Sequence, residues 1–238
     1  MNAQTIRLLV GWLVVSLLGT ATAFSQSTNA LTPAEKKDGW VLLFDGISTT
    51  GWTTTGGKTV PDGWVTQNGT LTAKKGAKGG DIVSAGQYAD FELTLDYNLA
   101  PEGNSGVKYF YTTYETGGNL GMEYQILDDK LAEDNKKANH LTGSFYDVLS
   151  PVVAQKKVNE PGQWNTLRIV AKGKQVEHWL NGVKLLEFVR GSPSFTEGVS
   201  ASKFSKTVPA FGTVDKGHIL LQEHGGEISF RNIKIKAF

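Results

Sequence analysis

Residues 121–128 read Gly121-Met122-Glu123-Tyr124-Gln125-Ile126-Leu127-Asp128 and indicate a β-strand fold. Apolar and polar residues alternate through its middle. Because successive side chains of a β-strand point to opposite faces, the pattern predicts a strand that buries one face and presents Glu123 and Gln125 together on the other. The alternative is an ordinary solvated strand face, since glutamate is most often exposed.

Strand and turn signals alternate along most of the chain. Residues 91–99 show the clearest alternation, and Asn68-Gly69 and Asn181-Gly182 supply the positive φ angles of tight hairpin turns. Residues 164–188 are predicted to form three strands in a meander. With no long amphipathic helix and no internal repeat, the pattern predicts an all-β fold, an antiparallel β-sandwich of jelly-roll type.

The remaining segments are predicted from turn residues and from the lack of a period. Residues 218–224 and 227–236 are expected to pair as a closing hairpin about Gly225-Gly226. Residues 128–140 and 190–213 are polar or rich in glycine and proline, and we expect loops there.

The last strand contains an irregularity in its apolar pattern. Ile228 and Phe230 stand at even positions, whereas Ile233 and Ile235 stand at odd ones. A side-chain period of two cannot put all four on one face without an extra residue, so we predict a β-bulge at Arg231-Asn232.

The first residues have the pattern of a secretory signal peptide. Arg7 precedes an apolar run over 8–18, and Ala21-Thr22-Ala23 is a small-residue cleavage site. The run is too short to span a bilayer, and the chain has no cysteine for a lipid anchor or a disulfide. We therefore expect a soluble periplasmic or secreted protein. The expected parts are a signal peptide (1–23), a polar and mobile leader (24–37) and a single domain (38–238).

Charge gives no reason to expect nucleic acid or an anionic membrane as a partner. The chain has 24 basic and 23 acidic residues, and removal of Arg7 with the signal peptide leaves 23 of each. It lacks a zinc-type ligand spacing, a phosphate-binding glycine loop and a Gly-x-Ser-x-Gly elbow. We expect a monomer.

Three further polar residues lie on predicted strands. Gln222 and His224 are two residues apart and therefore share a face, where they could line a cleft. A histidine beside a Gly-Gly turn can also be a plain capping residue. His178 has apolar neighbours of the same parity, so a core histidine is at least as good an interpretation as a binding one.

Other candidates lie at turns and at the predicted bulge. The bulge could direct Arg231 into a site, although pairing with a carboxylate across the sheet is the alternative. Asn104 lies in a Gly-Asn-Ser-Gly segment that could bind hydroxyl groups or form an ordinary turn. Tyr146 follows the Glu123 strand and could line a cleft, and Asp128 ends that strand.

Several motifs occur in order along residues 38–236. They are Gly39-Trp40, Leu43-Phe44-Asp45-Gly46, Gly51-Trp52, Gly103-Asn104-Ser105-Gly106-Val107, the 121–128 stretch, Thr142-Gly143-Ser144-Phe145-Tyr146-Asp147, Trp164-Asn165, His178-Trp179-Leu180-Asn181-Gly182, Leu221-Gln222-Glu223-His224-Gly225 and Phe230-Arg231-Asn232-Ile233. Together they resemble the 3-keto-disaccharide hydrolase domain family, which implies a concanavalin A-like jelly roll. Glu-x-Gln-x-x-Asp also resembles the Glu-x-Asp-x-x-Glu strand of jelly-roll glycoside hydrolases, with Gln125 in place of one acid.

The resemblance implies a secreted enzyme, a hydrolase or lyase that cleaves glycosides already oxidised at C3, with an upstream oxidoreductase supplying the substrate. We expect Glu123 as the base and His224 as the acid that protonates the leaving oxygen. The expected substrate-binding residues are Gln125, Asp128, Gln222, Arg231, Asn104, His178 and Tyr146. No cofactor is required by this scheme, although a divalent metal on Glu123, Asp128 and His224 would stabilise the same charge.

Two other functions remain open from the sequence. The first is a non-catalytic carbohydrate-binding module that uses the same face. The second is a retaining glycosidase that cleaves unoxidised sugars, to which the amide at Gln125 fits less well.

Overall fold

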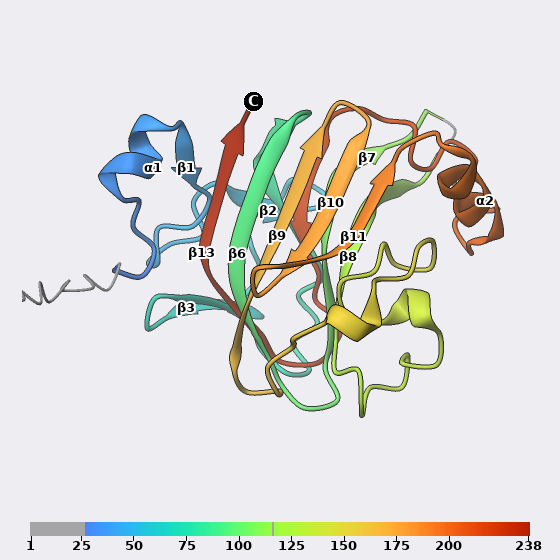
Figure 1. Ribbon diagram of the computed structural model, residues 1–238. Coiled ribbons are helices and arrows are strands. Elements are labelled where there is room, and N and C mark those ends of the chain that lie inside the picture. The colour runs from blue at the N-terminus through green and yellow to red at the C-terminus, as the bar shows by residue number, and fades with distance from the viewer. Residues whose placement is uncertain (1–26, 116) are drawn as a thin grey trace, which may run out of the picture.

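Two antiparallel β-sheets pack face to face in the computed structural model of the protein, which describes residues 27–115 and 117–238 (Figure 1). The eight-stranded sheet has the order β11 (Val183–Val189), β10 (Gln175–Leu180), β9 (Trp164–Lys172), β6 (Phe91–Leu99), β13 (Ile228–Ala237), β4 (Thr70–Ala73) and β3 (Trp64–Gln67), with β1 (Trp40–Leu42) paired to β13. The five-stranded sheet has the order β2 (Trp52–Thr54), β5 (Ile82–Tyr88), β12 (Gly217–Leu221), β7 (Asn104–Thr113) and β8 (Asn119–Leu127). This architecture confirms the predicted antiparallel jelly-roll sandwich.

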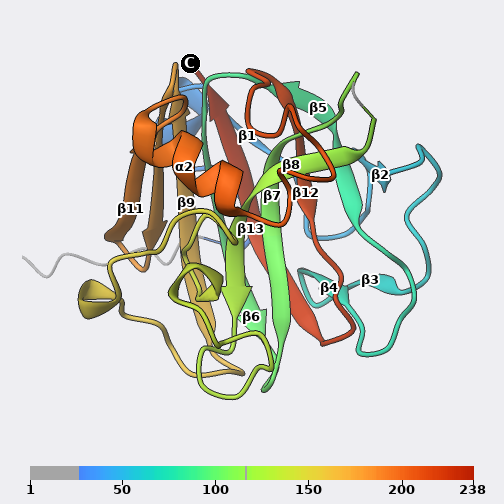
Figure 2. The same ribbon diagram turned by 90° about the vertical axis from the view of Figure 1, so that its right-hand side faces the viewer.

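Helices are few in the described ranges. They are α1 (Pro33–Lys37), α2 (Pro193–Ala201) and the 3-10 turns Ala138–His140 and Val153–Gln155. Figure 2 shows α2 lying outside the two sheets, with the five-stranded sheet beside it. No helix in the described part of the chain is both long and apolar enough to cross a membrane.

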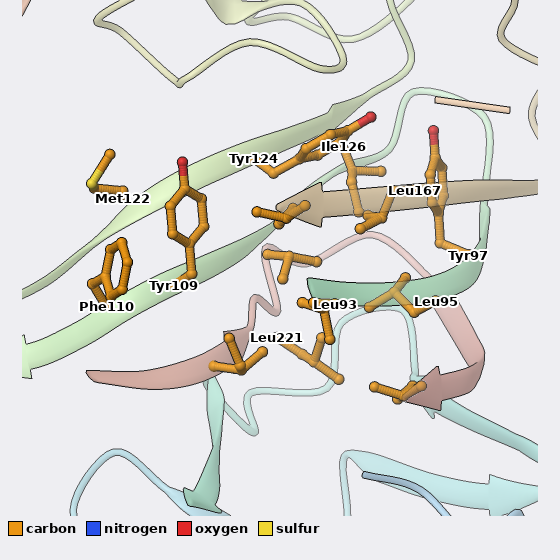
Figure 3. Packing of buried hydrophobic residues seen from close by; sticks show 14 of the residues in the cluster. Leu93, Leu95, Tyr97, Tyr109, Phe110, Met122, Tyr124, Ile126, Leu167 and Leu221 are labelled. Carbon is orange, nitrogen blue, oxygen red and sulfur yellow. The ribbon is translucent and has the colours of Figure 1, made fainter. Parts of the chain in front are cut away.

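The core lies between the inward faces of the two sheets (Figure 3). Along β6 the odd-numbered residues from Phe91 to Leu99 are buried and the even-numbered ones are partly exposed, as the alternation predicts. From the other sheet, β8 contributes Met122, Tyr124 and Ile126. Each fully buried side chain of this size stabilises the fold by about 1.5–3 kcal/mol, so these two strands hold the layers together.

The predicted hairpins at the Asn-Gly dipeptides are confirmed. Asn68 and Gly69 connect β3 to β4 with φ angles of 52° and 73°, and Asn181 and Gly182 connect β10 to β11 with 47° and 80°. Residues 128–140 are largely turns, as predicted.

The bulge in the last strand is also confirmed. The register of β13 against β6 shifts between Arg231 and Lys234, and Asn232 has a φ of 52°. The extra residue lets Ile228, Phe230, Ile233 and Ile235 all reach the core, where each is at most 1% exposed.

The predicted closing hairpin is wrong. β12 belongs to the five-stranded sheet and β13 to the eight-stranded sheet, so residues 222–227 carry the chain from one layer to the other. Gln222 stays along β7 through a bond from its backbone N–H to the carbonyl of Gly106 at 3.0 Å. Gly225, with a φ of 83°, then turns the chain away from that sheet.

Residues 190–213 are not all loop, because α2 lies within them. Ser192 caps the helix by accepting from the N–H of Phe195, and Pro193 occupies its first turn, where proline is tolerated. Phe195 stacks near Phe145 and Phe188, each with its ring centre 6.0 Å away. This tertiary packing outweighs the glycine and proline content that suggested a loop.

The polar leader carries ordered structure from residue 27 onward, whereas the predicted signal peptide (1–23) lies outside the described residues. Asn29 and Asn232 exchange two hydrogen bonds between side-chain oxygen and backbone N–H, at 2.7 and 2.8 Å. Thr32 and Glu35 form a capping box at the start of α1. These bonds attach the expected mobile segment to the bulge of β13.

The loop after β8 folds back along that strand. The N–H of Gly143 donates to the carbonyl of Gln125 at 2.9 Å, and the N–H of Gln125 donates to the carbonyl of Ser144 at 3.2 Å. The N–H of Tyr146 donates to the carbonyl of Glu123 at 3.0 Å. Residues 143–146 therefore pair with the outer backbone edge of β8.

Candidate functional site

Strand pairing in the five-stranded sheet places the polar pair of β8 next to β7. Glu123 lies opposite Lys108, and Gln125 lies opposite Gly106. A Cβ atom at position 106 would collide with the carboxylate of Glu123. Glycine at this position therefore leaves the space that the carboxylate fills.

A hollow of about 120 Å³ opens over these strands. It is lined by Asn104, Lys108, Glu123, Gln125, Tyr146, Lys203, Phe204, Gln222 and His224. These residues come from β7, β8, the loop that covers β8, the turn after α2 and the crossover after β12.

The structure brings six of the nine predicted site residues together in this hollow. They are Glu123, Gln125, Asn104, Tyr146, Gln222 and His224. Gln125 donates from Nε2 to Oδ1 of Asn104 at 3.0 Å, and the hydroxyl of Ser105 donates to the carbonyl of Gln222 at 2.8 Å. The distant segments 104–125 and 222–224 are thus linked directly.

Asp81 and Glu223 hold the crossover segment next to the hollow. The N–H of Glu223 donates to Oδ1 of Asp81 at 3.0 Å, and the Glu223 carboxylate accepts from the N–H of Gly225 at 2.8 Å. Between these bonds His224 remains exposed and faces the hollow.

Three lining residues were missed from the sequence. Lys108 could have been predicted. It lies four residues after Asn104 in β7, and side chains an even number of residues apart in a strand point to the same face. Lys203 and Phe204 follow α2 in a segment without period, and no local signal points to them.

Glu123 is a buried acid with both positively and negatively charged side chains nearby. Its side chain is 7% exposed, and Lys108 Nζ lies 3.8 Å from Glu123 Oε2 and 3.6 Å from Asp81 Oδ2. Burial raises the pKa of Glu123, Lys108 and Lys203 oppose that change, and Asp81 adds to it. Burial likewise raises the pKa of Asp81. The hollow therefore holds a carboxylate that is more basic than an exposed one.

Two amide oxygens in the hollow are buried acceptors. Oε1 of Gln125 and Oε1 of Gln222 have no hydrogen-bond partner among the described residues. A buried acceptor without a donor costs about 1–3 kcal/mol. Hydroxyl groups of a ligand would satisfy both oxygens.

Asp128 does not join the site. Its carboxylate accepts from three backbone N–H groups, those of Glu102, Lys130 and Leu131, at 2.9–3.2 Å. It borders a separate, mainly apolar hollow of about 50 Å³. The predicted binding role is replaced by a structural one, because the carboxylate closes the turns on either side of the strand.

His178 is a core residue. It is 0% exposed; its Nδ1 donates to the carbonyl of Gly143 at 3.0 Å, and its Nε2 accepts from the hydroxyl of Tyr109 at 2.8 Å. Burial lowers its pKa to about 4. With both nitrogens used inside the fold, it has no free group for a substrate.

Arg231 lies on the other sheet. Its Nε donates to Oδ2 of Asp96 on the paired strand at 3.2 Å, and its guanidinium stacks on Trp164 at 4.0 Å. The bulge thus directs Arg231 to a carboxylate across the sheet and away from the hollow.

Asp128, the third member of the metal set considered from the sequence, does not line the hollow with Glu123 and His224. In the described ranges no cluster of three or more His, Cys, Asp or Glu side chains is arranged to hold a metal ion.

Two larger hollows adjoin the central one at His224. One, of about 500 Å³, is lined by Glu102, Asn104, Ala132, Glu133, Asp134, Tyr146, His224 and Gly226. The other, of about 440 Å³, is lined by Gly76, Ala77, Lys78, Glu223, His224 and Gly225. A ligand larger than one ring could extend from the centre past His224.

Comparison with known proteins identifies the family. The model of the 3-keto-alpha-glucoside-1,2-lyase-like domain matches residues 39–236. The chain belongs to this family. A 3-keto-disaccharide hydrolase of Bacteroides thetaiotaomicron is 31% identical over 232 residues, covering 84% of this chain and 78% of the relative. Membership of the 3-keto-alpha-glucoside-1,2-lyase-like family confirms the resemblance found in the sequence and places the chain among carbohydrate hydrolases.

Solved structures support the same fold. Two structures from Parabacteroides distasonis ATCC 8503, each provisionally described as a glycosyl hydrolase, are 33% and 31% identical to the chain. Their TM-scores are 0.79 and 0.64, and the matches cover 89% and 84% of this chain and 99% of each structure.

Proposed function

We propose that the chain cleaves glycosides whose sugar carries a ketone at C3, by elimination across C1 and C2 followed by addition of water. One observation carries the proposal: among the described residues lining the hollow, Glu123 is the single acid, and it lies with an imidazole and two lysines. The name of the relative, 3-keto-disaccharide hydrolase, supports the same substrate class.

The chemistry requires one base and one acid. A ketone at C3 acidifies the C2 proton, and its removal gives an enolate with negative charge on the C3 oxygen. When the ketone re-forms, the electron pair moves into a C1–C2 double bond and the bond from C1 to the leaving oxygen breaks. Water then adds to C1 and a proton returns to C2, so that the net reaction is hydrolysis.

The residues of the hollow fit these roles. Glu123 takes the C2 proton, for which a raised pKa makes its carboxylate a stronger base. His224, at the junction of the three hollows, gives a proton to the leaving oxygen. The amide oxygens of Gln125 and Gln222 accept hydrogen bonds from sugar hydroxyls.

The residues that line the hollow disfavour the mechanism of a retaining glycosidase. That mechanism uses two carboxyl groups about 5–5.5 Å apart. Asp81, which pairs with the same lysine as Glu123, does not line the hollow. Elimination needs no second carboxylate.

We also propose that residues 1–23 direct export and are then removed. N-terminal sequencing of the protein recovered from the periplasm or the medium tests this, with residue 24 expected first.

A substrate assay tests the function. Purified residues 24–238 should release the leaving sugar from a 3-keto-glucoside and leave the matching glucoside intact, with and without a chelator. In D₂O the product should carry deuterium at C2, because elimination exchanges that proton. Cleavage without C2 deuterium would contradict elimination, and binding without turnover of either sugar would indicate a carbohydrate-binding module.

A further inference from the structure

Two lysines line the hollow, and their surroundings differ. Lys108 lies between the carboxylates of Glu123 and Asp81, at 3.8 and 3.6 Å, and is largely buried. Lys203 is exposed, and its ammonium forms no ion pair with a carboxylate of the described residues. The charge of Lys108 is neutralised by its two neighbours, whereas that of Lys203 is available to a ligand.

The ammonium of Lys203 is nevertheless held in place. It donates to the hydroxyl of Tyr146 at 3.1 Å and lies 4.4 Å from the centre of the Tyr146 ring and 5.3 Å from that of Phe204. An ammonium has three donors, so this arrangement leaves two for a ligand.

A closed circuit of hydrogen bonds fixes this arrangement. The hydroxyl of Tyr146 donates to Asp134 at 2.7 Å, and His140 lies between Asp134 and Asp147 at 2.7 and 2.9 Å. Asp147 accepts from the backbone N–H of Lys203 at 2.8 Å. The circuit therefore joins the loop over β8 to the turn after α2 and holds both ends of Lys203.

We propose that Lys203 is a catalytic residue that donates hydrogen bonds to the C3 oxygen of the substrate and stabilises the enolate; this rests on the proposed function. The base removes the C2 proton, the C–H pair becomes the C2–C3 double bond, and the charge moves to the C3 oxygen beside the Lys203 ammonium. Lys108 instead positions Glu123, because its charge is shared between two acids. A held cation is worth most where charge develops during the reaction.

The test separates enolate formation from departure of the leaving group. An analogue with hydrogen in place of the C1 leaving group can exchange its C2 proton in D₂O without losing a group at C1. Exchange in this analogue and cleavage of a 3-keto-glucoside are measured for the wild type, Lys203→Met, Lys203→Arg and the nearby exposed control Lys206→Met. Because the bond to Asp147 comes from the backbone, Lys203→Met should fold normally, which its unfolding midpoint checks.

We expect Lys203→Met to lose about 100- to 1,000-fold in kcat of both exchange and cleavage. Lys203→Arg should recover part of both rates, and Lys206→Met should match the wild type. A Lys203→Met variant that exchanges and cleaves as the wild type does, or that raises KM alone, overturns the assignment while the proposed function stands. A wild type that neither exchanges nor cleaves overturns both.

Discussion

The two sheets each carry an acid and a cation on neighbouring strands, and the two pairs are built differently. On the eight-stranded sheet, Asp96 accepts from Arg231, Asn232 and Thr166 at 2.7–3.2 Å. On the five-stranded sheet, Lys108 approaches Glu123 only to 3.8 Å, longer than a direct hydrogen bond.

The difference lies in what remains for a ligand. The oxygens of Asp96 are occupied by neighbouring side chains, and Arg231 is stacked on Trp164. Glu123 is more deeply buried than Asp96, at 7% against 16% side-chain exposure, yet it borders a hollow. An acid that its neighbours saturate stabilises the fold, whereas a buried acid with open oxygens is available for proton transfer.

Glu123→Gln should have the largest effect on activity. Removing the proposed base should lower turnover of a 3-keto-glucoside by about a hundred- to ten-thousand-fold. Steady-state kinetics measure this, with Glu92→Gln on the eight-stranded sheet as the matched control. An unaltered rate would remove Glu123 from the mechanism.

The two histidines differ in a similar way, since His178 is buried in the core and His224 is exposed. Burial lowers the pKa of His178 in the folded protein to about 4, below its ordinary value of 6.5. Between pH 4 and pH 6.5, His178 therefore binds a proton more readily in the unfolded chain than in the folded one. The stability that His178 contributes is therefore present above pH 6.5 and is lost as the pH falls through 4, on the order of 3 kcal/mol.

Denaturant unfolding of the wild type and His178→Gln between pH 7 and 4.5 measures this effect. The wild type should lose more stability over that range than the variant. Equal losses would show that the buried imidazole does not control the acid sensitivity.

Lys108→Met should destabilise the fold by about 1–3 kcal/mol at neutral pH, because the buried carboxylate of Glu123 and the partly buried one of Asp81 lose their partner. The pKa values of Glu123 and Asp81 are already raised, so folding favours their protonated forms. The stability that these two acids contribute should therefore fall as the pH rises above the ordinary carboxyl range, so that Lys108→Met loses stability relative to the wild type as the pH rises. Free energies of unfolding at pH 4.5 and 7.5 give both slopes, and parallel slopes would contradict this account.

Arg231→Met should have the smallest effect. Asp96 keeps Asn232 and Thr166 as donors, and a partly exposed ion pair is worth about 1 kcal/mol or less. Unfolding should shift slightly while kcat/KM stays unchanged. A large loss of activity would place Arg231 in the mechanism after all.

Local sequence patterns predicted the strands and the site residues that lie on β8. Alternation over 91–99 and 121–128 fixes which side chains face inward, and the change of parity in the last strand requires the bulge at Arg231-Asn232. These features depend on side-chain period, which neighbouring residues determine.

Long-range packing determined what the sequence could not predict. The turn after α2 reaches the hollow because Phe195 packs on distant aromatic residues and Asp147 binds the backbone of Lys203. The crossover at 222–227 resembles a hairpin locally, and only the pairing of β12 with β5 and β7 excludes it. Asp128 lies outside the hollow, and its carboxylate accepts from nearby backbone N–H groups, which no local pattern in the sequence predicted.

Residues 143–146 also affect how readily the protein aggregates. β8 is the outermost strand of its sheet, and an uncovered outer strand can pair with the same strand of another molecule and start aggregation. Backbone bonds from this segment occupy that edge and, in the same few residues, set Tyr146 over the hollow. A deletion here should therefore reduce solubility and catalysis together.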